Sequence, residues 1–221
     1  MSLLKESQAR EDICRIGKSL YDRGYIHGAA GNISARLDNG FLITPTDACM
    51  GFLDPARLAK LDSHAVQING DRASKTIAAH AGIYSAIAQN NPVGCIIHTH
   101  STHCVALTLQ GVTGELLAPI TPYFVMKVGR VPVIGYHRPG SGAAVQEIAT
   151  VIEKYSQRGT QIRAVMLPRL GPLVWAVNPF AAMAVLDELH ETARLVCQQP
   201  DISPLTDAQI EELRQVFGAV W

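Results

Sequence analysis

The sequence lacks the marks of several common protein classes. Its five cysteines are odd in number and scattered, and none forms a C-x-x-C pair, which argues against a disulfide framework and against a zinc–thiolate cluster. No stretch reaches the roughly 18 uninterrupted apolar residues of a membrane span, and residues 1–6 contain no long apolar run of a secretory leader. We therefore expect a reduced, cytoplasmic protein that does not enter a membrane.

The charge of the chain has no bias of either sign. Lys and Arg together number 19, as do Asp and Glu, so the formal net charge is zero. A balanced chain gives no electrostatic reason to bind nucleic acid or a polycation. Its 221 residues, 48% of them hydrophobic, fit a single globular domain over residues 1–221 whose partner is a small-molecule substrate.

Hydrophobic periodicity predicts helices and strands that alternate without a break in composition. Helices are expected at residues 8–23, 74–88, 101–109, 143–155, 179–197 and 206–216. Strands are expected at residues 41–44, 65–68, 93–99, 131–134, 162–167 and 173–177, with a further strand after the turn at 28–34. Residues 112–140 are expected to be largely irregular. Hairpin turns such as Asp38-Asn39-Gly40 favour antiparallel pairs, so we expect an α/β domain whose sheet is not purely parallel.

The most informative stretch is an apolar run that ends in two histidines, His98 and His100. Side chains alternate along a strand, so this spacing places both imidazoles on one face. Two imidazoles at the end of a buried strand make half of a transition-metal site.

An ordered set of short motifs resembles the class II aldolase/adducin-head family. These motifs are Gly31-Asn32-Ile33-Ser34, Leu42-Ile43-Thr44-Pro45-Thr46, His80-Ala81-Gly82-Ile83-Tyr84, His98-Thr99-His100-Ser101, Thr121-Pro122-Tyr123, Val131-Pro132-Val133 and Gly171-Pro172. Within the family, the chain is most similar to the 3-oxo-tetronate 4-phosphate decarboxylases and related aldolase-like proteins.

The resemblance implies a three-layer α/β/α sandwich with a mostly antiparallel central sheet, and a homotetramer with active sites near subunit interfaces. It also implies three histidines that hold a divalent metal ion, with zinc expected first and manganese or iron as alternatives. A glutamate serves as ligand or acid/base, and an Asn, a Thr-Gly pair and a Ser-Ser pair cradle the substrate phosphate.

Three site positions depart from the family pattern. Thr76 stands where the glutamate is expected, Leu170 stands where the third histidine is expected, and Asp47 replaces the glycine of the Thr-Gly pair. His98 and His100 are therefore the expected metal ligands, without a third one at its usual place. Candidate replacements are Asp47, His80, His103 and His137, although His80 fits a supporting role better; His190 is expected to be solvated.

Polar residues in the small-residue turns are the expected substrate contacts. Asn32, Thr46 and Ser74 offer hydrogen-bond donors suited to an oxyanion, and Lys75 adds a positive charge. Lys75 and Asp47, as a possible ion pair, and Tyr123, as a proton donor, are the expected catalytic residues.

The sequence thus predicts a divergent, metal-dependent carbon–carbon lyase that cleaves or decarboxylates a small sugar acid or ketose, phosphorylated or not, through an enediolate. Two alternatives stay open. The pocket could run metal-independent chemistry, or the chain could be a non-catalytic binding protein similar to the adducin head.

Overall fold

The computed structural model describes residues 5–87, 93–199 and 201–221. The strands are β1 (Asn32–Leu37), β2 (Gly40–Ile43), β3 (Ala59–Leu61), β4 (Gln67–Asn69), β5 (Cys95–His98), β6 (Gly114–Glu115), β7 (Pro132–Val133), β8 (Ala164–Leu167) and β9 (Gly171–Ala176). The helices are α1 (Glu6–Asp22), α2 (Ile77–Ala86), α3 (Thr102–Leu109), α4 (Gly142–Gln157), α5 (Pro179–Gln198) and α6 (Asp207–Phe217). Three short helices complete the set: η1 (Met50–Phe52), η2 (Pro55–Arg57) and η3 (Phe124–Val128).

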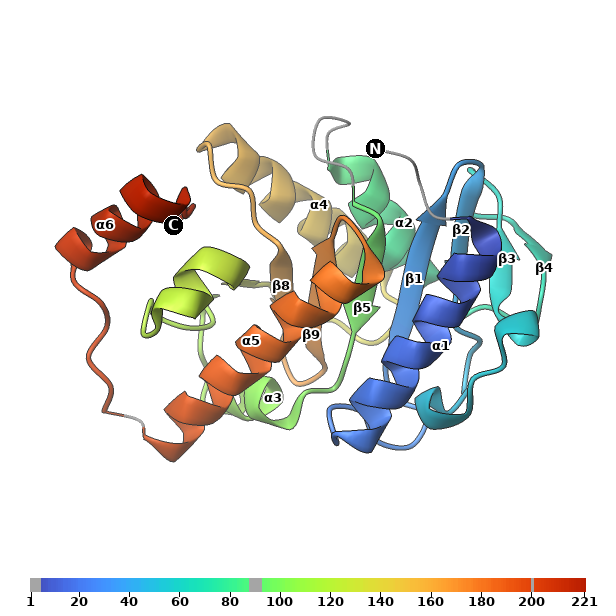
Figure 1. The fold of residues 1–221 in the computed structure, drawn as a ribbon, viewed down its shortest axis with the longest axis horizontal. Coiled ribbons are helices and arrows are strands. Elements are labelled where there is room, and N and C mark those ends of the chain that lie inside the picture. Colours follow the sequence, from blue (N-terminus) through green and yellow to red (C-terminus); the bar gives the residue numbers. More distant parts are fainter. Residues whose placement is uncertain (1–4, 88–92, 200) are drawn as a thin grey trace.

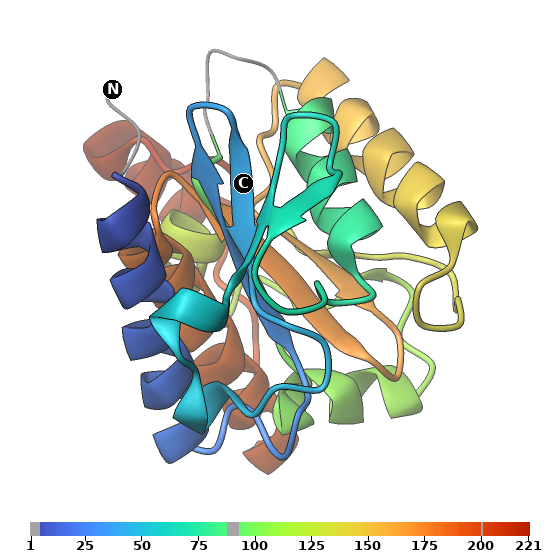
Figure 2. The same cartoon turned by 90° about the vertical axis from the view of Figure 1, so that its right-hand side faces the viewer.

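In the described part of the chain, the nine strands form one sheet in the order β4-β3-β2-β1-β5-β9-β8-β7-β6. Seven of the eight neighbouring pairs are antiparallel, and β7–β8 is parallel. Helices α1 and α5 cover one face, and α2 and α4 cover the other (Figures 1 and 2). The predicted three-layer sandwich with a mostly antiparallel sheet is confirmed.

Two hydrophobic clusters lie on either side of the sheet. On the α1/α5 side, Ile13, Ile16 and Leu20 of α1 recur at helical spacing and are buried against the sheet. On the α2/α4 side, Ile83 of α2 and Ile148 of α4 close the second cluster. Burial of these apolar faces is the main favourable contribution to the fold.

The predicted helices and longer strands are present with small shifts at their ends. The helix expected from residue 74 begins at Ile77, and its predicted last residue, 88, lies outside the described residues. The elements that were not predicted include β3, β6, η1 and the π-helical turn η3, which lies inside the segment 112–140 expected to be irregular. Each is five residues or shorter, too short to show a hydrophobic period.

Two glycines hold the backbone at the end of β5. Gly31 has a φ of +80°, and a Cβ on it would lie 2.6 Å from the His98 carbonyl oxygen. Gly171 has a φ of +134°, and a Cβ there would lie 1.9 Å from the Thr99 carbonyl oxygen. Both positions require glycine because of their backbone angles and because of this close approach. The tip of β5 is therefore clamped between two backbones.

The last helix, α6, lies apart from the main body at one end of the molecule (Figure 1). A capping box at Thr206 and Gln209 starts α6, and beyond it Trp221 packs edge-on against Phe124. Within the described residues, no helix is both long enough and apolar enough to cross a membrane.

Candidate active site

The two strand-end histidines lie together where β5 ends at His98, shortly before α3 begins at Thr102. Their ring centroids are 5.2 Å apart, at an interplanar angle of 65°. His98 is 3% exposed, and burial lowers its pKa to about 4. His100 is more open, and burial lowers its pKa as well. Both rings are therefore neutral at pH 7, the form that binds a cation or accepts a proton.

The tautomer of His98 is fixed by the backbone. Its Nδ1 lies 2.9 Å from the Pro172 carbonyl oxygen, which can only accept, so Nδ1 carries the proton. Nε2 then carries a lone pair, and His98 is one of the residues that line a cavity. A histidine held in this way by a carbonyl is the usual arrangement of a metal ligand, and equally of a hydrogen-bond acceptor.

This cavity, here called the His98 cavity, lies between α2, α4 and the loop that precedes α4. Its lining includes Thr76, His98, His137, Arg138, Leu170 and Leu173. It encloses about 40 Å³, room for about three water molecules. Most of the exposed wall is apolar.

A divalent metal fits this donor set only in part. His98 and His100 supply two neutral imidazoles, whereas catalytic zinc normally takes three protein ligands. Among the described residues, no group of three or more His, Cys, Asp or Glu side chains could hold an ion, and residues 1–4, 88–92 and 200 contain none of these types. Thr76 and Leu170, which stand where the family resemblance implies a glutamate and a third histidine, line this cavity together with His98. The residues of one chain therefore do not fit a complete metal site.

Among the described residues, none of the replacement ligands considered from the sequence joins His98 and His100 in a three-ligand group. His80 is fully buried and bonds to Asn32 and Ser34. His137 pairs with Glu147 at 2.6 Å, and the Asp47 side chain is 79% exposed.

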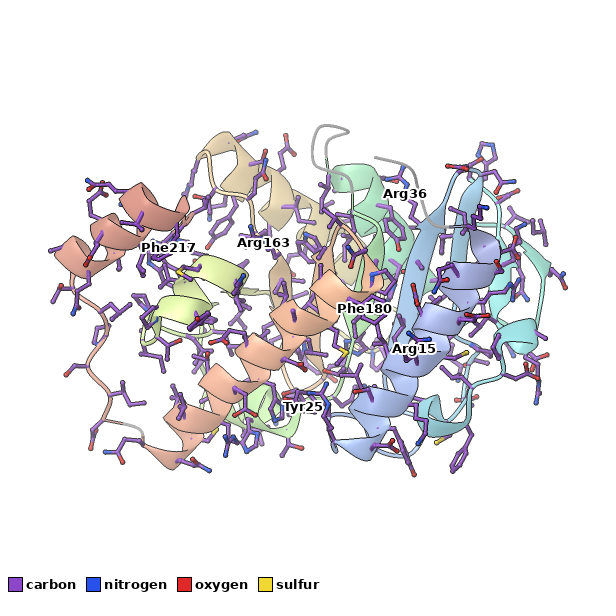
Figure 3. All side chains as sticks on the ribbon, viewed as in Figure 1. Arg15, Tyr25, Arg36, Arg163, Phe180 and Phe217 are labelled. Atoms are coloured by element: carbon purple, nitrogen blue, oxygen red, sulfur yellow. The ribbon has the colours of Figure 1, made fainter. Side chains whose placement is uncertain are left out.

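His103 bonds to His190 at 3.2 Å between ring nitrogens. The expectation that His190 is solvated is wrong. It is buried, and its Nδ1 lies 2.9 Å from the Ser101 hydroxyl. Its ring centroid is 4.0 Å from that of Tyr25, a residue labelled in Figure 3.

Asn32 lies directly opposite His98, because β1 and β5 pair in that register. Its Oδ1 is 2.6 Å from His80 Nε2. The other ring nitrogen, His80 Nδ1, is 2.8 Å from the Ser34 hydroxyl, which is 2.8 Å from the Tyr84 hydroxyl. Sequence analysis singled out Asn32 and His80 but missed Ser34 and Tyr84. Their spacing could have found them, because Ser34 is two residues along the strand from Asn32 and Tyr84 is one helical turn from His80.

The other expected anion contacts lie at the start of α2. Ser74 is buried, and its hydroxyl is 3.0 Å from the Thr76 hydroxyl. The Lys75 ammonium is 3.9 Å from an Asp47 oxygen, with both side chains mostly exposed. Lys75 lines the His98 cavity, whereas Thr46 and Asp47 line a separate surface cavity of about 490 Å³. The expected residues thus divide between two neighbouring hollows.

Within one chain, Tyr123 lies away from His98 and His100. It is 61% exposed and precedes η3, and η3 packs on α5, on the opposite face of the sheet from α2 and α4. Arg138, by contrast, lines the His98 cavity and brings a positive charge to it. The loop that carries it is anchored by Glu147, which accepts from the Gly135 N–H at 2.8 Å and pairs with His137.

Comparison with known proteins gives one consistent result. The family described as "Class II Aldolase and Adducin N-terminal domain" matches residues 11–197. The 3-oxo-tetronate 4-phosphate decarboxylase of Cupriavidus necator is 49% identical over 98% of this chain and 99% of the relative. The enzyme of the same name from Escherichia coli K12 is 38% identical over 95% and 96%.

Solved structures agree with this result. YgbL from Escherichia coli, described as an aldolase, epimerase or decarboxylase, superposes with a TM-score of 0.83 at 36% identity, over 95% of this chain and 99% of that one. An L-fuculose 1-phosphate aldolase reaches the same TM-score at 21% identity, over 98% of both chains, which is a likeness of fold.

Proposed function

Because the chain belongs to the family of the class II aldolase and adducin N-terminal domain, we propose that it is a carbon–carbon lyase that decarboxylates a phosphorylated 3-oxo sugar acid. Five relatives at 36–49% identity, each matched over at least 92% of this chain, bear the name 3-oxo-tetronate 4-phosphate decarboxylase. Within the structure, the observation that carries the proposal is the pairing of Asn32 with His98 across two strands beside a cavity with a cationic rim.

The name of that substrate defines the chemistry the pocket has to perform. A 3-oxo-tetronate 4-phosphate has a carboxylate at C1, a ketone at C3 and a phosphate at C4. The C1–C2 bond breaks, CO2 leaves, and the electron pair moves into an enolate with its charge on the C3 oxygen. Protonation of C2 then gives a three-carbon hydroxyketone phosphate. The protein must bind two anionic groups, stabilise one developing charge and supply one proton.

Residues of the His98 cavity, of the neighbouring surface cavity and of the strands and turns beside them match these tasks. Arg138 and Lys75 supply positive charge for the carboxylate and the phosphate. Asn32 donates N–H to a substrate oxygen, and Ser74 and Thr46 donate hydroxyls to the phosphate. His98 Nε2 accepts from a substrate hydroxyl. The cavity is smaller than the substrate, so the substrate lies across its mouth with the reacting end inside.

We assign proton transfer to C2 to Lys75, which is one of the residues that line the cavity. An Asp47 carboxylate oxygen lies 3.9 Å from the Lys75 Nζ. Tyr123 can act only at the site of a second copy of the chain. This role depends on the homotetramer that the family resemblance implies.

Class II aldolases generally depend on a divalent metal, for which zinc is the first expectation here. When bound, such an ion polarises the carbonyl and stabilises an enolate. In this chain only His98 and His100 would hold it, and these two imidazoles are too few, so the steps above use the protein's own donors.

The direct test is turnover of 3-oxo-tetronate 4-phosphate by the purified chain, followed as CO2 release. We expect turnover with this acid and none with the same compound reduced at C3, because the C3 ketone accepts the electron pair. L-Fuculose 1-phosphate is the comparison for aldol cleavage. Turnover of that compound alone would overturn the decarboxylase assignment.

A second candidate is binding without turnover. Thr76 and Leu170 favour it, because both replace groups that the family uses for chemistry. Calorimetric binding of the substrate without CO2 release would establish it.

A further inference from the structure

We infer that Tyr84, Ser34 and His80 form a one-directional hydrogen-bond relay that holds the Asn32 side chain with its amide N–H toward the substrate. His80 is then a positioning residue for Asn32. The inference rests on the proposed function, because the anionic oxygen that Asn32 meets belongs to the proposed substrate.

The relay is continuous and buried. Tyr84 and Ser34 oxygens are 2.8 Å apart, Ser34 Oγ and His80 Nδ1 are 2.8 Å apart, and His80 Nε2 and Asn32 Oδ1 are 2.6 Å apart. All four residues are at most 8% exposed, and His80 is at 0%. A side chain there for packing alone would be apolar, since a buried polar group needs every partner it can find.

The direction of the relay follows from its last member. Asn32 Oδ1 can only accept, so His80 Nε2 must donate. Burial lowers the pKa of His80 to about 3, so the ring is neutral and carries one proton. Nδ1 must then accept from the Ser34 hydroxyl, and the Ser34 oxygen accepts from the Tyr84 hydroxyl. In this arrangement each of the three hydrogen bonds has a defined donor and acceptor.

The result is a directed amide group at the site. With Oδ1 engaged, the Asn32 Nδ2 protons are left to donate outward. No described residue accepts from this nitrogen, and it is not among the fully buried unpaired atoms, so it borders space that water reaches. If the amide turned over, Nδ2–H would face the N–H of His80, and an oxygen would face the substrate anion. A His80 proton on Nε2 therefore disfavours that orientation.

The tautomer of His80 tests the relay without any turnover. In protein labelled with ¹⁵N-histidine, long-range ¹H–¹⁵N spectra show which ring nitrogen carries the proton, and His80→Gln identifies the signal. We expect a neutral ring protonated on Nε2 between pH 5 and 9. A proton on Nδ1, or a ring that titrates in this range, would overturn the relay.

Kinetics of matched variants test the positioning role. His80→Gln keeps a donor toward Asn32, whereas His80→Leu removes it. We expect kcat/KM to fall about 10-fold or more in His80→Leu and to stay within about 3-fold in His80→Gln. Rescue by glutamine is a readout that packing alone would not give. Equal losses in both variants, with both folded by circular dichroism, would contradict positioning.

The graded variants Ser34→Ala and Tyr84→Phe keep the test open if His80→Leu does not fold. Each lies one step further from Asn32, so the loss in kcat/KM should shrink from Ser34→Ala to Tyr84→Phe. The reverse order would overturn the relay. A wild-type chain without turnover would overturn the proposed function, while the His80 tautomer would still decide the relay.

Discussion

The two sides of the His98 ring differ in how their polar groups are satisfied. On the β1 side, Asn32 and His80 belong to a buried network in which both His80 ring nitrogens and the Asn32 Oδ1 have a hydrogen-bond partner. On the β9 side, Leu170 and Leu173 contribute apolar lining to the His98 cavity, which Thr76 also lines. The first side is built from strand register and a helix, which fix several residues together. The second depends on single side chains, so each can be exchanged without disturbing the sheet.

The largest effect should come from making the apolar side resemble the family. Thr76→Glu combined with Leu170→His adds two ligands beside His98. We expect zinc affinity to rise on the order of 1,000-fold, because each ligand should count for at least the 10- to 100-fold that outer-shell partners carry. Titration calorimetry and the absorption spectrum of bound cobalt measure it. The triple variant that also carries His98→Ala is the control and should lose the gain. Unchanged affinity would mean that Leu170 does not face His98 in solution.

Among single substitutions on the β1 side of His98, Asn32→Asp should reduce activity the most. The carboxylate keeps the hydrogen bond from His80 but has no N–H for the substrate, and it adds a charge that repels the anion. We expect kcat/KM to fall about 100-fold, the scale of one lost donor to a developing charge. Asn178→Asp, which retains the cap on the Ala181 N–H of α5, is the isosteric control and should leave activity unchanged.

The buried histidine of the polar side should make stability depend on pH. The pKa of His80 is about 3 in the folded chain, below the ordinary value of about 6.5 in an unfolded chain. The unfolded state therefore binds more protons between these values. The contribution of His80 is complete above pH 6.5 and is lost as pH falls toward 3, by up to about 1.4 kcal/mol per pH unit.

Urea unfolding at several pH values measures this loss in wild type and in His80→Gln. The variant should show a shallower dependence, by about one proton. Identical slopes would mean that His80 is protonated in the folded state.

The smallest effect is expected at Asp47. This residue has a φ of +57° at a position where the family resemblance implies glycine, and its side chain is mostly solvated. Asp47→Gly should raise the affinity for inorganic phosphate about 2- to 3-fold at low salt, and less at high salt, because solvent and ions screen an exposed charge. Asp47→Asn removes the charge and keeps a side chain, so it separates charge from backbone freedom. A gain in Asp47→Gly alone would assign the effect to the backbone.

Sequence patterns predicted the layers, the long helices and the paired histidines, because each of these leaves a period in the chain. They did not reveal where side chains meet across elements. His190 has charged neighbours on α5 yet is buried against Tyr25 and His103, a contact that needs the packing of α3 on α5. Tyr123 has a sequence motif of the family, but the fold places it away from His98. Ser34 and Tyr84 have the right spacing, and only their distances show that they form one network with Asn32.

The glycine clamp at the tip of β5 has a consequence for protein engineering. Gly31 and Gly171 leave no room for a side chain against the His98 and Thr99 carbonyls, so the path of the main chain there is preserved whatever reactive groups surround it. A library that varies Asp47, Thr76 and Leu170 while both glycines stay fixed would explore new chemistries on an unchanged frame. The fold can therefore serve as a scaffold in which the site residues are replaced one at a time while the backbone stays unchanged.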